Sequence, residues 1–147
     1  MRTLVVVDMQ PYYVDPKAPY IDRVIELISW FRADGSPIIF VEFGYGGGKT
    51  VEAVRDTVRR YGNHVTVVKR GIDGGREVLD ACRIHGFPTD FVVCGVSVTC
   101  CVMDTSDTLV EDRPVEVVMD CTDADDTEQW KGDDRVKANR WFTKEAA

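Results

Sequence analysis

The sequence lacks a long hydrophobic run, has no block of basic residues and contains only two histidines. Its first apolar stretch, residues 4–7, is far too short for a signal peptide or a membrane span, and Asp8 follows it directly. The net charge of −7 argues against a nucleic-acid partner, because binding to a phosphate backbone needs clustered Lys and Arg. We therefore expect neither a membrane nor a nucleic acid among the partners.

Cysteine occurs five times, and an odd number leaves at least one thiol unpaired. Without a signal peptide, this usage is typical of a reducing compartment, so we expect a cytoplasmic protein rather than a disulfide scaffold. Three of the thiols, Cys82, Cys94 and Cys121, fall inside apolar segments and are expected in the core. Cys100 and Cys101 are treated separately below.

The apolar segments predict the fold class. A chain of 147 residues suits one domain, here residues 1–147. Five short segments rich in β-branched residues are typical of strands buried on both faces, as in a parallel sheet. These segments are residues 3–8, 37–43, 65–69, 90–95 and 115–120.

Four segments between the strands carry residues at helical spacing, and each is followed by a glycine or a proline. The repeats are Ile21, Val24, Ile25 and Ile28; Val51, Val54 and Val58; Val78, Leu79 and Cys82; and Val102, Ser106, Leu109 and Val110. A further helix is predicted over residues 136–142. The alternation predicts a three-layer α/β/α domain, Rossmann-like and doubly wound, with a mostly parallel sheet of five or six strands.

The segment FVEFGYGGGKT, residues 40–50, invites comparison with a phosphate-binding loop. The Walker A pattern has four residues between its first glycine and the Gly-Lys-Ser/Thr. Here Phe43 stands where that glycine is required, and Gly44 comes one position too late. A nucleotide hydrolase with Asp120 as its magnesium ligand remains an alternative, but a mobile glycine-rich rim of a pocket is favoured.

The acidic segment DCTDADD, residues 120–126, suggests a cation site at first sight. It lacks the glycine and the terminal glutamate of an EF-hand loop. We therefore expect a solvated loop there.

Three reactive side chains lie at the carboxyl ends of predicted strands, where doubly wound sheets bind their ligands. Asp8 closes the first strand, Lys69 closes the third, and Cys101 begins the helix after the fourth. A helix N-terminus and a nearby ammonium both lower the pKa of a thiol, and Asp8 is suited to accept its proton. Together the three predict a nucleophilic site.

These segments resemble the motifs of the isochorismatase-like cysteine hydrolases, which include nicotinamidases and N-carbamoylsarcosine amidase. LVVVDMQ resembles the first strand of that family, with its catalytic aspartate at Asp8, and VVKRG resembles the segment of its catalytic lysine, at Lys69. In VVCGVSVTCCVMDT, the nucleophile follows a glycine by six positions and precedes a valine, a register met by Gly95, Cys101 and Val102. The resemblance covers roughly residues 4–120.

The resemblance implies a mechanism. Asp8 would take the thiol proton, Lys69 would stabilise the thiolate, and Cys101 would attack a carbonyl carbon. A thioester would form, release an amine or ammonia, and be hydrolysed by water. A cis peptide bond between Val96 and Ser97 is also implied, with the N–H groups of Ser97 and Cys101 forming an oxyanion hole.

The same resemblance implies substrate contacts at Gln10 and Tyr13. The glycine-rich loop is expected to form one wall of the pocket, with further substrate contacts at Gly44 and Tyr45. For Tyr13, a plain packing role stays equally open. The glycine loop, residues 44–50, has free backbone N–H groups, and Lys49 is expected near the mouth of the pocket. These groups are suited to an anionic substrate.

Histidine marks the main departure from the nicotinamidases, which hold a divalent metal through an Asp and histidines after the second strand. Residues 42–50 contain no histidine, and His64 and His85 lie near predicted turns or helix ends. We therefore expect no metal, no cofactor and no nicotinamidase activity. A cysteine at position 101 also disfavours vinyl-ether cleavage, because isochorismatases of that type generally lack the nucleophile.

The favoured function is a metal-independent cysteine amidohydrolase that cleaves a small amide or a related C–N bond. The alternatives are a non-catalytic binding or scaffold protein with the same fold, and the nucleotide hydrolase. The expected partner is a small-molecule substrate, and the resemblance implies a homodimer or higher homo-oligomer. Trp30, Trp130 and Trp141 are expected either at such an interface or in the core.

Overall fold

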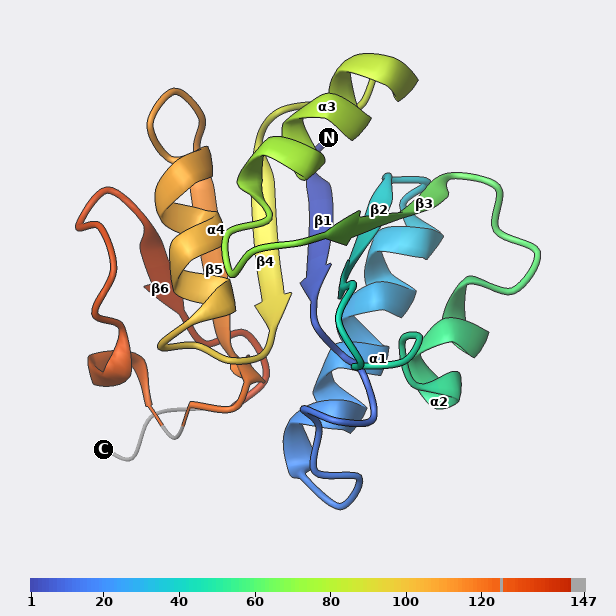
Figure 1. The fold of residues 1–147 in the computed structure, drawn as a ribbon, viewed down its shortest axis with the longest axis horizontal. Coiled ribbons are helices and arrows are strands. Elements are labelled where there is room, and N and C mark those ends of the chain that lie inside the picture. Colours follow the sequence, from blue (N-terminus) through green and yellow to red (C-terminus); the bar gives the residue numbers. More distant parts are fainter. Residues whose placement is uncertain (125, 144–147) are drawn as a thin grey trace.

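The computed structural model describes residues 1–124 and 126–143. At its centre, six parallel strands lie in the order β3-β2-β1-β4-β5-β6, with helices on both faces (Figure 1). The strands are β1 (Thr3–Val7), β2 (Ile38–Phe43), β3 (His64–Lys69), β4 (Phe91–Gly95), β5 (Val115–Thr122) and β6 (Lys137–Asn139). The helices are α1 (Pro19–Ala33), α2 (Glu52–Arg55), α3 (Gly75–His85) and α4 (Cys101–Leu109), with short turns η1 (Asp56–Val58) and η2 (Thr127–Gln129). The predicted three-layer, doubly wound fold is confirmed.

Strand β1 shows why an uninterrupted apolar segment forms the centre of the sheet. All five of its residues are buried. Leu4 and Val6 pack against the layer of α1 and α2, whereas Val5 and Val7 pack against α3 and α4. Because successive side chains of a strand alternate between faces, a strand between two helix layers needs apolar residues at every position.

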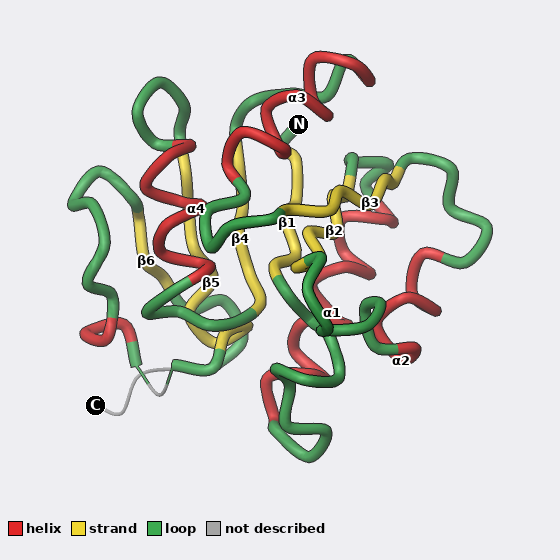
Figure 2. Tube along the Cα trace, viewed as in Figure 1, coloured by secondary structure: helices red, strands yellow, loops and turns green. Residues whose placement is uncertain are grey.

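The helix ends follow the predicted glycines. Gly35 and Gly86 adopt φ angles of 72° and 69°, which a glycine reaches without steric cost. The predicted helix through Val51, Val54 and Val58 is shorter than expected, because α2 passes into the η1 turn, and loop follows as far as β3 (Figure 2). No helix among the described residues combines the length and hydropathy that a membrane span requires.

Strand β3 differs from the prediction of burial on both faces. It lies at the edge of the sheet, with β2 as its only strand neighbour among the described residues. Val68 is consequently 58% exposed, and only Lys69 of its six residues is classed as buried. An edge position leaves one side of a strand open, which the hydrophobic pattern of residues 65–69 does not reveal.

The predicted helix over residues 136–142 is wrong, because this segment contains β6, parallel to β5. The Asp120 carboxylate accepts hydrogen bonds from the amides of Trp141, Phe142 and Thr143, at 3.0, 2.7 and 2.8 Å. Burial raises the pKa of Asp120, but these amides outweigh it and hold the pKa below its usual value. The interactions with β5 override local helical spacing, and they commit Asp120 to the fold rather than to a magnesium ion.

The acidic segment is likewise not one solvated loop. Residues 120–122 complete β5 and are buried. Asp126 caps η2, where its side chain accepts a hydrogen bond from the Glu128 amide at 2.8 Å. Residue 125 lies outside the described residues.

Two of the three tryptophans pack on each other where the tail crosses α1. The rings of Trp30 and Trp141 stack with centroids 6.4 Å apart, and Phe142 lies 4.6 Å from Trp30. Trp130 is partly buried against the core on the α3 and α4 side. Trp30 remains 48% exposed, so its ring covers the tail without being enclosed.

Candidate active site

The three predicted catalytic side chains come from separate elements that meet at the carboxyl edge of the sheet, where the arrows of β1 and β4 end in Figure 1. Asp8 directly follows β1, Lys69 is the last residue of β3, and Cys101 is the first residue of α4. Asp8 has a φ of 51°, which an aspartate tolerates better than most residues. This edge is where doubly wound sheets place their ligands.

Lys69 and Asp8 form a buried ion pair. The Nζ atom of Lys69 lies 3.1 Å from Oδ2 of Asp8, and their side chains are 0% and 3% exposed. Nζ also donates hydrogen bonds to the carbonyls of Gly71 and Ile72, at 3.2 and 2.8 Å. The ring of Phe43 lies 5.1 Å from the same ammonium. Lys69 is thus held in one position with its charge directed at Asp8.

Cys101 interacts with both members of this pair. Burial, together with the hydrogen bond and the charge of Asp8, raises the pKa of the Cys101 thiol to about 12, while Lys69 lowers it. Burial also raises the pKa of Asp8, against the lowering effects of Cys101 and Lys69. The expected low thiol pKa is therefore not found in the free site. The resting group is a neutral thiol beside a carboxylate that binds protons more readily than usual.

One carboxylate oxygen of Asp8 is unpaired. Oδ1 is buried and has no hydrogen-bond partner of regular geometry among the described residues. A buried unpaired carboxylate oxygen is costly unless something else requires it. The Asp8 carboxylate also interacts with the Cys101 thiol, so it is suited to accept a proton.

The segment before Cys101 has the expected backbone conformation. The peptide bond between Val96 and Ser97 is cis. The Ser97 carbonyl accepts hydrogen bonds from the amides of Cys100 and Val102, at 3.1 and 3.0 Å. Within residues 1–124 and 126–143, no group accepts a hydrogen bond from the amides of Ser97 or Cys101. Both predicted oxyanion donors are thus available.

Gly95, at the end of β4, explains how this segment approaches β1 so closely. Its φ is 108°, and a Cβ atom there would lie 2.1 Å from the carbonyl oxygen of Val7. Any side chain would push the two strand ends apart. Steric crowding against β1 therefore explains why this position of the motif is a glycine.

Gln10 holds the glycine loop through hydrogen bonds between its side chain and the loop backbone. Its amide donates to the carbonyls of Phe43 and Gly48 at 3.0 and 2.6 Å, and its oxygen accepts from the Phe43 amide at 2.7 Å. The side chain is fully buried. A Cβ atom on Gly47 would lie 2.5 Å from Gln10 Nε2, so the loop packs directly on this amide. These bonds give Gln10 a role in holding the glycine loop, and its predicted substrate contact stays a prediction.

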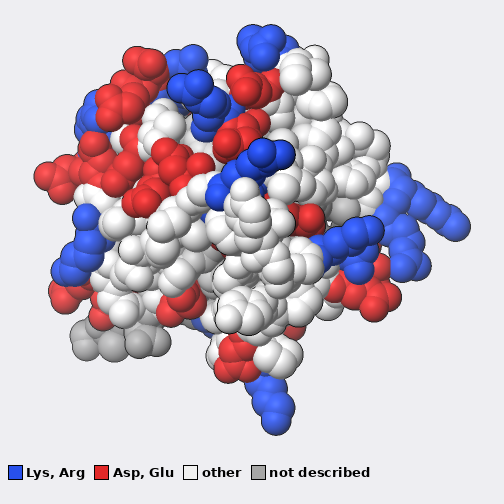
Figure 3. All heavy atoms as spheres, viewed as in Figure 1, with Lys and Arg blue, Asp and Glu red and all other residues white. Residues whose placement is uncertain are grey.

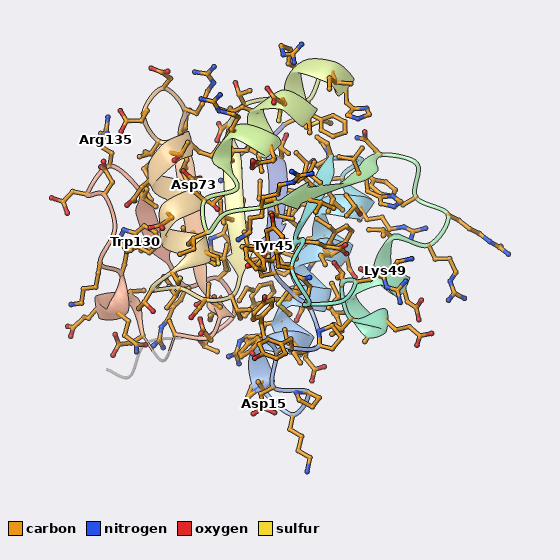
Figure 4. The ribbon with its side chains drawn as sticks, in the orientation of Figure 1. Asp15, Tyr45, Lys49, Asp73, Trp130 and Arg135 are labelled. Atoms are coloured by element: carbon orange, nitrogen blue, oxygen red, sulfur yellow. The ribbon has the colours of Figure 1, made fainter. Side chains whose placement is uncertain are left out.

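The same loop does not fit a bound nucleotide. The Glu42 carboxylate accepts hydrogen bonds from both the amide and the hydroxyl of Thr50, each at 2.7 Å. These are the groups that a phosphate-binding loop would offer to phosphate and magnesium, and here a negative charge holds them. Figure 4 shows Lys49 on the α2 side, apart from Tyr45, which lies over the middle of the sheet.

Aromatic rings form the rim of the site. The centroid of Phe43 lies 6.3 Å from that of Tyr13 and 5.6 Å from that of Tyr45. Tyr13 is 36% exposed and Tyr45 is 64% exposed. Partial burial and the charges of Asp8 and Cys101 raise the pKa of Tyr13. Gly44, another predicted site residue, lies between Phe43 and Tyr45 in the sequence. Its amide donates a hydrogen bond to the Lys69 carbonyl at 2.9 Å, which joins this segment to the end of β3.

Asp123 is a residue of this site that the sequence did not reveal. It follows β5, and its carboxylate accepts a hydrogen bond from the Ser97 hydroxyl at 2.7 Å and another from the Val98 amide at 2.8 Å. It thus clamps the segment that carries the cis peptide. Its place just beyond a strand end was the available signal, but the surrounding acidic residues suggested a solvated loop.

Thr105 was also missed. It is fully buried on α4, and its hydroxyl oxygen accepts a hydrogen bond from the Gly74 amide at 2.9 Å. A Cβ atom on Gly74 would lie 3.0 Å from Cδ of Lys69. Thr105 therefore ties the helix of Cys101 to the loop that packs along the lysine stem.

No group of three or more His, Cys, Asp or Glu within the described ranges has the spacing of a metal site. His64 contacts the Tyr61 carbonyl through Nδ1 at 2.5 Å, and the ring of His85 stacks on Phe87 at 5.3 Å. All five cysteines are free thiols.

The family follows from a sequence profile of the isochorismatase domain, which matches residues 2–133. This chain belongs to the isochorismatase family. No curated protein matches the sequence.

Solved structures agree with this family at the level of the fold. The N-carbamoylsarcosine amidase of Thermoplasma acidophilum superimposes with a TM-score of 0.72 at 20% identity, covering 99% of this chain and 100% of that one. A nicotinamidase of Staphylococcus aureus gives a TM-score of 0.73 at 17% identity, covering 86% and 87%. The Escherichia coli YcaC gene product, described as an octameric hydrolase of unknown specificity, gives 0.71 at 18%, covering 96% and 75%.

Proposed function

We propose that this isochorismatase-family protein is a cysteine amidohydrolase that cleaves a small amide or a related C–N bond without a metal. The observation that carries the proposal is the buried contact of 3.1 Å between Lys69 and Asp8, with the Cys101 thiol interacting with both. An acid, a cation and a thiol in one buried cluster are costly for stability and useful for acyl transfer. The names of two structural relatives, an amidase and a nicotinamidase, point to the same bond type.

The first chemical step is proton transfer from the Cys101 thiol to Asp8. The raised pKa of the thiol means that no thiolate is stored in the free enzyme. The raised pKa of Asp8 makes it a stronger base, and its unpaired Oδ1 has room for the proton. The side chain of Lys69, which contacts Asp8, lies beside the forming thiolate and offsets its cost.

The sulfur then attacks the carbonyl carbon and the C=O electrons move to oxygen. The amides of Ser97 and Cys101 donate to this oxyanion, and each such donor typically contributes about 3 kcal/mol to lowering the barrier. The C–N bond breaks as Asp8 returns its proton to the leaving nitrogen, which leaves a thioester. Water attacks the thioester and gives a proton to Asp8. The C–S bond then breaks, the sulfur recovers a proton, and a carboxylic acid is released.

The rim indicates what kind of substrate enters. Tyr13, Phe43 and Tyr45 offer ring faces and edges, which suit a flat acyl or aromatic group. The glycine loop adds backbone N–H groups but no fixed side-chain cation, because Lys49 lies on the α2 side. We therefore favour a small, planar, uncharged amide over an anionic one.

A hydroxylamine trap tests the proposal. Purified protein is incubated with nicotinamide, N-carbamoylsarcosine, benzamide and a set of short primary amides, and ammonia release is measured with and without hydroxylamine. A thioester intermediate predicts a hydroxamate product in place of part of the acid. Cys101→Ala is expected to lower turnover by about 10⁴-fold or more.

Cys100→Ala is the matched control, because Cys100 is the sequence neighbour of the nucleophile and is expected to keep turnover within about twofold. Turnover that survives Cys101→Ala would refute the thioester route. If no amide is hydrolysed and hydroxylamine traps no acyl group, the non-catalytic scaffold alternative is favoured instead.

A further inference from the structure

A second charged site lies on the opposite face of β3 from Lys69. A hollow of about 320 Å³ opens between the turn after α2 and the outer half of β3. Its polar lining includes Arg55, Asp56, Arg59, Arg60 and His64. We refer to it as the arginine hollow. Its volume is at the lower end of the range for small-ligand sites.

The charges of the arginine hollow are poorly neutralised by the protein itself. Arg59 is paired with Asp56 at 2.8 Å, but both side chains are largely exposed. Arg55 and Arg60 form no ion pair with any described residue. Three guanidinium groups therefore meet one carboxylate, in a chain whose net charge is −7. Figure 3 shows basic side chains gathered at this right-hand edge, over the segment between α2 and β3.

The segment that carries these arginines is held in place rather than loosely exposed. Arg32 on α1 donates to the carbonyls of Thr57 and Arg59, at 2.9 and 2.8 Å, and stacks over the ring of Tyr61 at 5.5 Å. The Tyr61 hydroxyl donates to the Ser36 carbonyl at 2.6 Å. The backbone that carries the guanidinium groups is thus held in place, which reduces the entropy lost on binding.

Arg60 has an unusual backbone. Its φ is 63°, and in the described part of the chain only Asp8 shares a positive φ without being a glycine. A left-handed arginine is uncommon and costs free energy that the surroundings must offset. Asp8 adopts this conformation to present its side chain to the catalytic cluster. Arg60 adopts it beside the arginine hollow.

The arginine hollow is separate from the cluster of Asp8, Lys69 and Cys101. His64 and Thr66 line it from β3, and side chains of a strand alternate between faces. Lys69, an odd number of positions along from each, points to the layer of α3 and α4. A ligand in the hollow would therefore not occupy the catalytic site.

We propose that the arginine hollow binds a phosphate dianion, either free or as the terminal group of a small metabolite. Guanidinium groups donate paired hydrogen bonds that match phosphate oxygens, and several can converge on one group. The excess of two positive charges in the lining equals the charge of a phosphate near neutral pH. The Thr66 hydroxyl supplies a further polar contact around the rim.

The test is a titration of the full chain with inorganic phosphate in a low-salt, phosphate-free buffer, followed by the amide NMR signals of residues 59–64. Saturable shifts are expected. Arg55→Ala and Arg60→Ala should each weaken binding about tenfold, because each removes a charge-assisted hydrogen bond. Arg60→Lys, which keeps the charge but not the paired geometry, should fall between Arg60→Ala and the natural chain.

Arg83→Ala is the matched control, since Arg83 is an exposed arginine beside Asp80 on α3, away from the hollow. It should leave binding unchanged. Ribose 5-phosphate and AMP distinguish the sources: tighter binding than phosphate identifies a metabolite, and equal binding identifies free phosphate. The absence of saturable shifts, or shifts of the same size in Arg55→Ala and Arg60→Ala, would overturn the proposal.

Discussion

The two faces of β3 use positive charge in opposite ways. On one face, Lys69 is fully buried, paired with Asp8 and bonded to two carbonyls, so its charge can act only on groups within the cluster that it forms with Asp8 and Cys101. On the other face, Arg55 and Arg60 border the arginine hollow without an ion pair to a described residue. A buried cation changes the pKa of its neighbours, whereas an exposed one attracts an anion from solution. The difference lies in burial rather than in residue type.

Lys69→Met should break this comparison most strongly. It leaves the Asp8 carboxylate buried without its cation, and removing one partner of such a pair costs about 3 kcal/mol or more. Urea unfolding should show this loss for Lys69→Met, whereas Arg55→Ala should change stability by about 0.5 kcal/mol or less. Amide turnover should also be lost in Lys69→Met.

The double variant Asp8→Asn/Lys69→Met is the control for that loss. Because it removes both charges, it should recover part of the stability, and the coupling energy follows from the cycle. Equal stability of Lys69→Met and the natural chain would mean that the pair contributes nothing.

Asp8→Asn should separate the reactivity of Cys101 from its catalysis. The carboxylate raises the pKa of the thiol, so its removal should lower that pKa, and Lys69→Met should raise it. At neutral pH, a larger fraction of Cys101 in Asp8→Asn would be thiolate, so it should react faster with iodoacetamide. Amide turnover should nevertheless fall, because the variant lacks the general base. The pH dependence of alkylation, followed by mass spectrometry, measures both shifts. Shifts in the same direction for the two variants would contradict this electrostatic account.

Asp123→Ala should have a smaller effect, because Asp123 acts through Ser97. Losing the hydrogen bonds to Ser97 and Val98 frees the segment that presents the oxyanion donors. We expect kcat to fall about tenfold with little change in KM, since the donors matter more in the transition state than in the substrate complex. Asp112→Ala, on an exposed turn, is the matched control. A change confined to KM would indicate direct substrate contact instead.

Lys49→Ala should have the smallest effect. Lys49 is exposed on the α2 side of the glycine loop, so we expect KM for neutral amides to change by less than about twofold. A large rise in KM for anionic amides alone would show that the glycine loop and Lys49 receive an anionic group.

Much of the site could be predicted from the sequence, because each of its main residues is marked by the short segment around it. Asp8, Lys69 and Cys101 each lie at a strand end that the apolar pattern marks, and parallel strands bring such ends to one edge. Gly95 and the Val96–Ser97 segment belong to the same continuous motif. Asp123 and Thr105 could not be assigned in this way, because their roles depend on Ser97 and Gly74, which are distant in sequence.

The sequence by itself determined the alternation of strands and helices, since burial between two helix layers demands continuous apolar segments such as residues 3–7. Tertiary structure alone decided the conformation of the tail and the direction in which the pKa of Cys101 is shifted. Local spacing favoured a helix over residues 136–142, but hydrogen bonds to Asp120 on β5 outweigh a weak helical preference. Likewise, the helix start and Lys69 suggested a thiolate, yet desolvation and the Asp8 carboxylate raise the pKa of Cys101 instead. Both outcomes depend on distances between segments that only the folded chain brings together.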